Sequence, residues 1–76
     1  MHHLLIERNP AVMLGKPVIK GTRITVELLM RKLSEGFTVE DILDMYPHLT
    51  ITQVRAAFAY AADKIADEIT YEVAAS

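Results

Sequence analysis

The chain has 76 residues and no cysteine, carries 8 Lys and Arg against 10 Asp and Glu, and is 51% hydrophobic but only 7% aromatic. A folded chain of this mass keeps roughly 4,700 Å² of the roughly 12,300 Å² that its unfolded form exposes, so a single domain over residues 1–76 has a small core. Without cysteine it has neither disulfides nor thiolate metal sites, and we expect a second copy, as a homodimer, or another protein to add stability. A deep catalytic cleft would reduce this core further, so the protein is not expected to be an enzyme.

The net charge of −2 hides an asymmetry along the chain. Residues 1–34 hold six basic and two acidic side chains, whereas residues 35–76 hold two basic and eight acidic ones. A basic front and an acidic back favour two partners of opposite charge or head-to-tail self-association. An uneven but functionally neutral surface is the alternative.

Membrane, metal and cofactor binding are not expected. Apolar runs are only a few residues long, against the roughly 20 that span a bilayer, and no basic-then-apolar leader precedes them, so we expect a cytoplasmic protein. His2 and His3 are adjacent but have no further ligand nearby, which makes a poor metal site.

The first 24 residues are expected to form an extended arm and a basic loop. Residues 4–8 are short, apolar and branched, and Asn9-Pro10 closes them with turn chemistry, which predicts a strand or arm. Residues 15–23 combine two glycines, a proline and a β-branched pair, which predicts a short extended piece held between turns.

Three helices are predicted over residues 25–66. Thr25 caps the first, over residues 26–34, and Thr38 with Asp41 approximates a capping box for a second, two-turn helix that ends before Pro47. Thr50 with Gln53 forms a better box for the third and longest helix. Its expected inward stripe is Ile51, Val54, Phe58, Ala61 and Ile65.

Residues 67–76 are interpreted as a tail. Apolar and polar residues alternate at period two over residues 69–73, which predicts an extended segment, and a frayed helix end is the alternative.

The glycine-containing loop suggests anion binding, but it does not match a P-loop. Five residues separate Gly15 from Gly21, and Thr22 follows Gly21 without the lysine that the motif requires. A cationic turn of Lys16, Lys20 and Arg23 remains, which suits a nucleic-acid backbone or an acidic protein surface, with solubility alone as the bland alternative.

No catalytic residue is assigned. His48, in a turn near a helix start, has no Ser or carboxylate partner at a telling spacing, and a small hydrolase would need an unrecognised site around it.

A two-turn helix, a four-residue connection and a longer helix have the dimensions of a helix-turn-helix unit. The face opposite the predicted stripe holds Thr52, Gln53, Ala56, Tyr60 and Asp63. Gln53 is a candidate for pairing with adenine, Thr52 for a base or phosphate, and Arg55 adds a basic side chain. The many alanines of this helix suit a helix-to-helix interface equally well.

Two motifs together resemble a known family. Residues 15–24 read Gly-Lys-Pro-Val-Ile-Lys-Gly-Thr-Arg-Ile, and residues 46–50 read Tyr-Pro-His-Leu-Thr. The pair is similar to the bacterial "domain of unknown function 433" family over most of residues 4–65. The resemblance implies a mainly α, homeodomain-like trihelical helix-turn-helix domain with a short β N-terminus, and an antitoxin-like role against a PIN-like ribonuclease.

We therefore expect a dimeric antitoxin-type protein that contacts operator DNA and covers a basic ribonuclease rim with its acidic end. The DNA-binding candidates are Lys16, Lys20, Arg23, Thr52, Gln53 and Arg55, and the partner-binding candidates are Asp67, Glu68, Ile69, Tyr71 and Val73. The alternative is a protein-interaction or dimerisation module with no nucleic-acid role.

Overall fold

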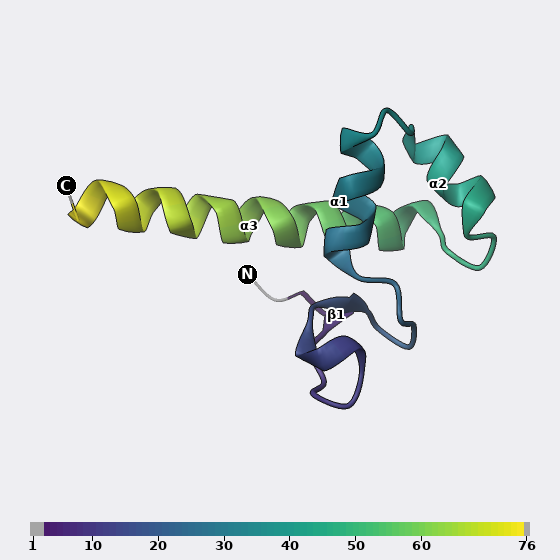
Figure 1. Cartoon of the computed structure of the whole chain (residues 1–76), viewed down its shortest axis with the longest axis horizontal. Coiled ribbons are helices and arrows are strands. Elements are labelled where there is room, and N and C mark those ends of the chain that lie inside the picture. The colour runs from purple at the N-terminus through teal and green to yellow at the C-terminus, as the bar shows by residue number, and fades with distance from the viewer. Residues whose placement is uncertain (1–2, 76) are drawn as a thin grey trace.

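The computed structural model describes the backbone of residues 3–75 and the side chains of residues 3–67. It is mainly helical, with a short antiparallel sheet at its N-terminus, as the sequence predicts (Figure 1). The elements are β1 (Ile6–Glu7), a 3-10 turn (Met13–Gly15), β2 (Val18–Ile19), α1 (Val26–Ser34), α2 (Val39–Met45) and α3 (Ile51–Ala75).

The two strands form a small hairpin that packs against the helices. Ile6 pairs with Ile19 and Glu7 with Val18, and both residues of β2 are fully buried. A further bridge joins Val18 to Thr25, which places the start of α1 beside the sheet. The predicted extended pieces at residues 4–8 and 15–23 thus become one hairpin.

All three helices begin where the sequence predicts, because each has its cap. The Thr25 hydroxyl accepts a hydrogen bond from the Leu28 N–H at 2.9 Å. Thr38 and Asp41 form a complete capping box at the start of α2. At the start of α3, the Gln53 side-chain oxygen accepts from the Thr50 N–H at 2.8 Å, and the Thr50 hydroxyl accepts from the Gln53 N–H at 3.2 Å.

The core lies where α1 and α2 cross the N-terminal half of α3. The seven buried apolar residues that form it are Ile19, Val26, Leu29, Ile42, Leu49, Val54 and Ala57. The expected inward stripe of α3 is partly wrong, because Ile51 and Ile65 are 41% and 51% exposed while Ala57 is fully buried. Tyr60, expected on the outer face, packs against the core instead. Ile51 is the first residue of α3, and Ile65 lies beyond Ala61, the last residue of this helix that packs against the core. Other elements therefore leave both side chains exposed.

The C-terminal segment is helical, and the expected extended conformation over residues 69–73 is wrong. Neither proline nor glycine occurs after residue 50, and α3 continues without a break to Ala75. The alternating polarity of residues 69–73 is therefore too short a pattern to end a helix that no proline or glycine interrupts. Of the partner-binding candidates, the side chains of Glu68, Ile69, Tyr71 and Val73 lie outside the described residues.

The long third helix makes the molecule elongated. Its extents are 44, 30 and 20 Å, and its radius of gyration is 13.4 Å, against about 11.4 Å for a compact domain of this length. The yellow end of α3 in Figure 1 projects past every other element. Within the part of the chain that the structure describes, no helix has the length and apolarity to cross a membrane.

Candidate binding surfaces

The Gly-Thr pair of the first motif builds a tight turn. Gly21 has a φ of 80°, which favours glycine, and its N–H donates to a Glu7 carboxylate oxygen at 3.1 Å. The Thr22 hydroxyl donates to the Ile19 carbonyl at 2.7 Å and accepts from the Ile24 N–H at 3.0 Å. This turn returns the chain from β2 towards α1 and leaves Arg23 exposed.

The second motif connects α2 to α3. Tyr46 packs against the core, Leu49 is buried within it, and Thr50 caps α3. Pro47 follows the end of α2, and His48 is exposed. Tyr46, Leu49 and Thr50 therefore have structural roles, and the exposed His48 side chain has none of these roles.

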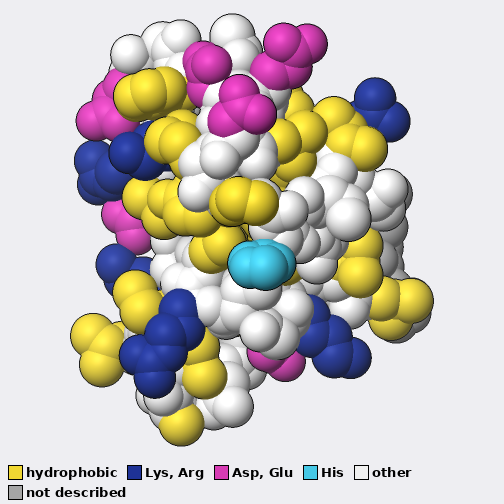
Figure 2. All heavy atoms as spheres, turned by 90° about the vertical axis from the view of Figure 1, so that its right-hand side faces the viewer, with side chains coloured by type: hydrophobic (Ala, Val, Ile, Leu, Met, Phe, Trp, Pro, Cys, Tyr) yellow, Lys and Arg dark blue, Asp and Glu magenta, His cyan; other side chains and the backbone are white. Residues whose placement is uncertain are grey.

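The two motifs meet in one groove, which we call the motif groove. It has a volume of about 550 Å³ and is lined by Gly21, Thr22, Arg23, Ile24, Met45, Tyr46, Pro47, His48 and Leu49. Figure 2 views the molecule from the α2 end: apolar side chains lie above an exposed histidine, Asp and Glu gather at the upper edge, and Lys and Arg lie at the sides. His48 was not predicted to belong to any site, because its proximity to Arg23 depends on the fold.

The first two turns of α3 expose two of the side chains that the sequence predicts to contact DNA. Thr52 and Arg55 are exposed, whereas Gln53 is half-buried and its side-chain oxygen is held by the capping box. Bidentate recognition of adenine needs both the oxygen and the amino group of a glutamine. In this geometry Gln53 is a cap, and Thr52 and Arg55 are the accessible groups.

The three basic residues of the predicted cationic turn do not share one surface. Lys16 pairs with Glu27 at 2.9 Å, and Arg31 reaches the same carboxylate at 3.1 Å. The hydrogen bond from Lys16, followed by that from Arg31, lowers the pKa of Glu27 below its usual 4.5. Lys20 is exposed beside the hairpin, where its N–H donates to the Leu5 carbonyl. Of the three, Arg23 alone lines the motif groove.

A second groove, which we call the lateral groove, runs between α1 and α3. Its volume is about 680 Å³, and its lining is Arg8, Lys16, Pro17, Val26, Glu27, Met30, Tyr60, Ala61, Lys64 and Ile65. Apolar side chains form most of it, with three cations and one carboxylate among them. It lies next to the point where α3 leaves the body of the molecule.

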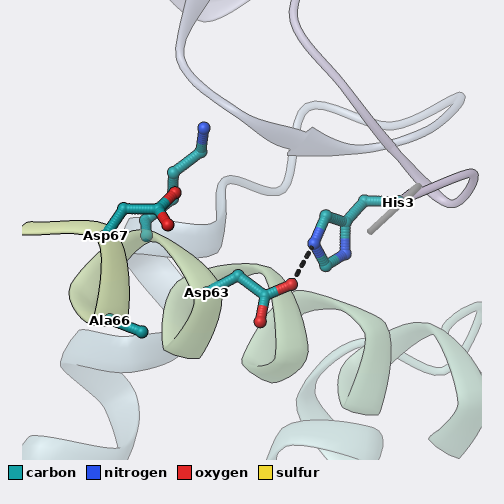
Figure 3. A pocket seen from close by; sticks show the side chains of 5 residues that line it. His3, Asp63, Ala66 and Asp67 are labelled. Atoms are coloured by element: carbon teal, nitrogen blue, oxygen red, sulfur yellow. Dashed lines mark hydrogen bonds and ion pairs between the residues drawn. The ribbon is translucent and has the colours of Figure 1, made fainter. Parts of the chain in front are cut away.

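The N-terminal residues cross α3 on yet another surface. His3 Nε2 and Asp63 Oδ2 lie 2.8 Å apart (Figure 3). The His3 ring stands edge-on to the ring of Tyr60, with the ring centroids 5.2 Å apart. A hollow of about 270 Å³ lies here, with Asp67 one turn beyond Asp63. This pair was not predicted from the sequence because 60 residues separate its members, and among the described residues no three His, Cys, Asp or Glu come together as a metal site.

Comparison with known proteins identifies the family of this chain. The model of the family described as "Protein of unknown function (DUF433)" matches residues 6–61, which include both motifs and the motif groove. The chain belongs to the DUF433 family. This match confirms the family membership that the two sequence motifs predict.

Two relatives agree with this assignment. The chain is 32% identical over 57 residues to the uncharacterised protein y4eO of Sinorhizobium fredii, matching 75% of this chain and 26% of that protein. It thus spans about a quarter of the relative's length. The crystal structure of a DUF433 member from Anabaena variabilis superposes with a TM-score of 0.75 at 31% identity, covering 92% of this chain and 68% of that one.

Proposed function

We propose that this DUF433 protein is a non-enzymatic binding protein of the antitoxin type, which contacts DNA with one end of α3 and a PIN-like ribonuclease with the other. The observation that carries the proposal is the continuity of α3 from the α2–α3 connection to Ala75. One rigid element of about 37 Å separates a partly basic end from an acidic end. The two ends can therefore serve two partners of opposite charge.

The DNA-binding half of the proposal rests on the surroundings of the α3 N-terminus. Arg23 lies in the motif groove beside the α2–α3 connection, and Thr52 and Arg55 are exposed on the first turns of α3. A helix N-terminus favours phosphate, and the start of the second helix of a helix-turn-helix unit is the part that enters the major groove.

The ribonuclease-binding half rests on charge and position. Asp67 is exposed, and Glu68 and Glu72 follow it in a helical segment that contains no Lys or Arg. An acidic segment that projects from the body suits the basic rim of an RNA-binding site. Because the segment is helical, the proposed contact is a helix laid on the ribonuclease and not an added strand.

The test starts from the reading frame next to the gene: a PIN-like ribonuclease found there is co-expressed with this chain, and the absence of such a gene would favour the second candidate function described below. The full chain should restore growth, and a variant carrying Asp67→Lys, Glu68→Lys and Glu72→Lys should fold but inhibit the ribonuclease at least about tenfold less well. The matched control reverses three acids of the body, Glu35→Lys, Glu40→Lys and Asp44→Lys, and should still neutralise. Equal neutralisation by both triple variants, or none by the full chain, would contradict this half of the function.

A protein-interaction module without a nucleic-acid role is the second candidate. The lateral groove favours it, because its mixed apolar and basic lining resembles a protein-binding surface more than a DNA-binding one. Neutralisation by a chain that binds no duplex would support this candidate over the DNA-binding one.

A further inference from the structure

The lateral groove has the chemistry of a protein-docking site. Met30 and Ile65 are 36% and 51% exposed, and together with Val26 they give the groove an apolar floor. Arg8, Lys16 and Lys64 add three positive charges around this floor, against the single carboxylate of Glu27. An occupant should therefore be both apolar and acidic.

The projecting end of α3 gives the chain more exposed surface than a compact monomer of the same mass (Figure 1). The accessible surface of the chain is 5591 Å², whereas a compact monomer of this mass exposes roughly 4,700 Å². A standard protein–protein interface, which buries roughly 800 Å² of each partner, would cover an area comparable to this excess of about 900 Å².

The chain itself contains a segment with the required chemistry. Residues 66–75 are helical and contain Asp67, Glu68 and Glu72 with no basic residue, together with Ile69 and Val73 at a spacing of four. Glu72 lies in the last turn of α3, where a negative charge opposes the helix dipole. A basic surface that covered this segment would offset this effect and pair with its other carboxylates.

A chain cannot place this segment in its own lateral groove. Lys64 and Ile65 of α3 line the groove, and α3 then continues without a break, so that residues 66–75 run away from the body (Figure 1). The segment could reach the groove of its own chain only if the helix broke. A second copy has no such restriction.

We propose that two copies form a symmetric dimer in which residues 66–75 of each chain occupy the lateral groove of the other. The two α3 helices run antiparallel, and a two-fold axis near Ala66 places Glu68 of one copy opposite Lys64 of the other. Symmetry makes the same contact twice, so both grooves are filled and both acidic segments are covered. This proposal does not depend on the proposed function, because it concerns self-association alone.

The experiment is sedimentation equilibrium on the full chain and on two complementary variants. A groove variant carries Lys16→Glu and Lys64→Glu, and a segment variant carries Glu68→Lys and Glu72→Lys. The wild-type chain should approach twice its 8.5 kDa mass. Each variant alone should dissociate at least about a hundredfold more readily, because like charges then face each other in both contacts.

An equimolar mixture of the two variants provides the decisive comparison. In a heterodimer the acidic groove of the groove variant faces the basic segment of the segment variant. The other contact joins an unchanged groove to an unchanged segment, so the mixture should dimerise like the wild type. The matched control for the groove variant is Lys20→Glu with Arg55→Glu, which makes the same charge change at exposed positions outside the groove and should leave dimerisation unchanged.

Three results would overturn the proposal. These are a wild-type chain that stays monomeric at millimolar concentration, a groove variant that dimerises as well as the control, and a mixture that stays monomeric. Circular dichroism of every variant checks that each is folded, so loss of the dimer is not mistaken for unfolding.

Discussion

The residues of the two family motifs divide into those that build the fold and those that face outward. Gly21 and Thr22 form hydrogen bonds that hold the turn after β2. Leu49 is buried in the core before α3, and Thr50 caps that helix. All but Thr50 of these residues line the motif groove, and there Arg23 and His48 contribute exposed, polar side chains. The motifs alone do not reveal this division, because it depends on contacts that only the folded chain makes.

Glu27 gives a pH-dependent prediction at the scale of a single residue. Its pKa lies below 4.5 because Lys16 and Arg31 bond to the carboxylate. A depressed pKa means that this pairing stabilises the fold above the unfolded-state pKa, and that the contribution is lost as pH falls through the folded-state pKa. The wild type should therefore lose more stability on acidification below pH 4.5 than Glu27→Gln does.

The titration of the Glu27 side-chain carboxyl by NMR measures this directly. Its midpoint should lie below 4.5 in the wild type and rise towards 4.5 in Lys16→Ala, by more than in Arg31→Ala, since Lys16 makes the larger contribution. Lys32→Ala, a change on the same helix that leaves the pairing intact, is the control. An unchanged midpoint in Lys16→Ala would show that the ion pair does not form in solution.

At the scale of elements, the helix starts were predictable because capping is local. Thr25, Thr38 and Thr50 each stand at the predicted boundary, and the two capping boxes involve partners three residues away. The hairpin register was less accessible from the sequence because it pairs residues on either side of a ten-residue connection. The burial of Ala57 was less accessible because it depends on how the other elements pack on α3. The continuation of α3 to Ala75 matches the helical alternative and not the extended segment, because five residues of alternating polarity are weaker evidence than the absence of proline and glycine after residue 50.

Gln53 gives a prediction for α3. Gln53→Ala removes the side-chain oxygen that accepts the Thr50 N–H at 2.8 Å, and should lower the free energy of unfolding by about 1 kcal/mol. Thr52→Ala, at the adjacent exposed position, should change it by no more than about 0.5 kcal/mol. Urea unfolding monitored by circular dichroism measures both. Equal effects would mean that the capping box contributes nothing to the stability of α3.

At the scale of the whole molecule, the charge asymmetry of the sequence takes a spatial form. Lys16, grouped with Arg23 from the sequence, belongs to the lateral groove, while Arg23 belongs to the motif groove. The candidate DNA-contacting set therefore narrows to Arg23, Thr52 and Arg55 with His48 added. The lateral groove was not predictable, because its lining comes from the hairpin, α1 and α3 together.

The proposed function and the proposed dimer make one joint expectation. Both use residues 66–75, so a ribonuclease bound to this segment and a second copy of the chain exclude each other. In these two proposals the acidic end of α3 would connect self-association to partner binding, and the α2 end would remain exposed in either state.

The central claim is that the α2 end of the molecule, with Arg23 and Arg55, contacts DNA. Fluorescence anisotropy with a labelled mixed-sequence duplex of about three helical turns, at salt concentrations from about 50 to 200 mM, tests it most directly. Arg23→Ala with Arg55→Ala should reduce the slope of log affinity against log salt by about 1.8, or about 0.9 for each phosphate that is no longer neutralised. The control, Arg31→Ala with Lys32→Ala, removes the same charge from α1 and should keep the wild-type slope. Equal slopes for the two double variants, or no duplex binding at the lowest salt concentration, would contradict the claim.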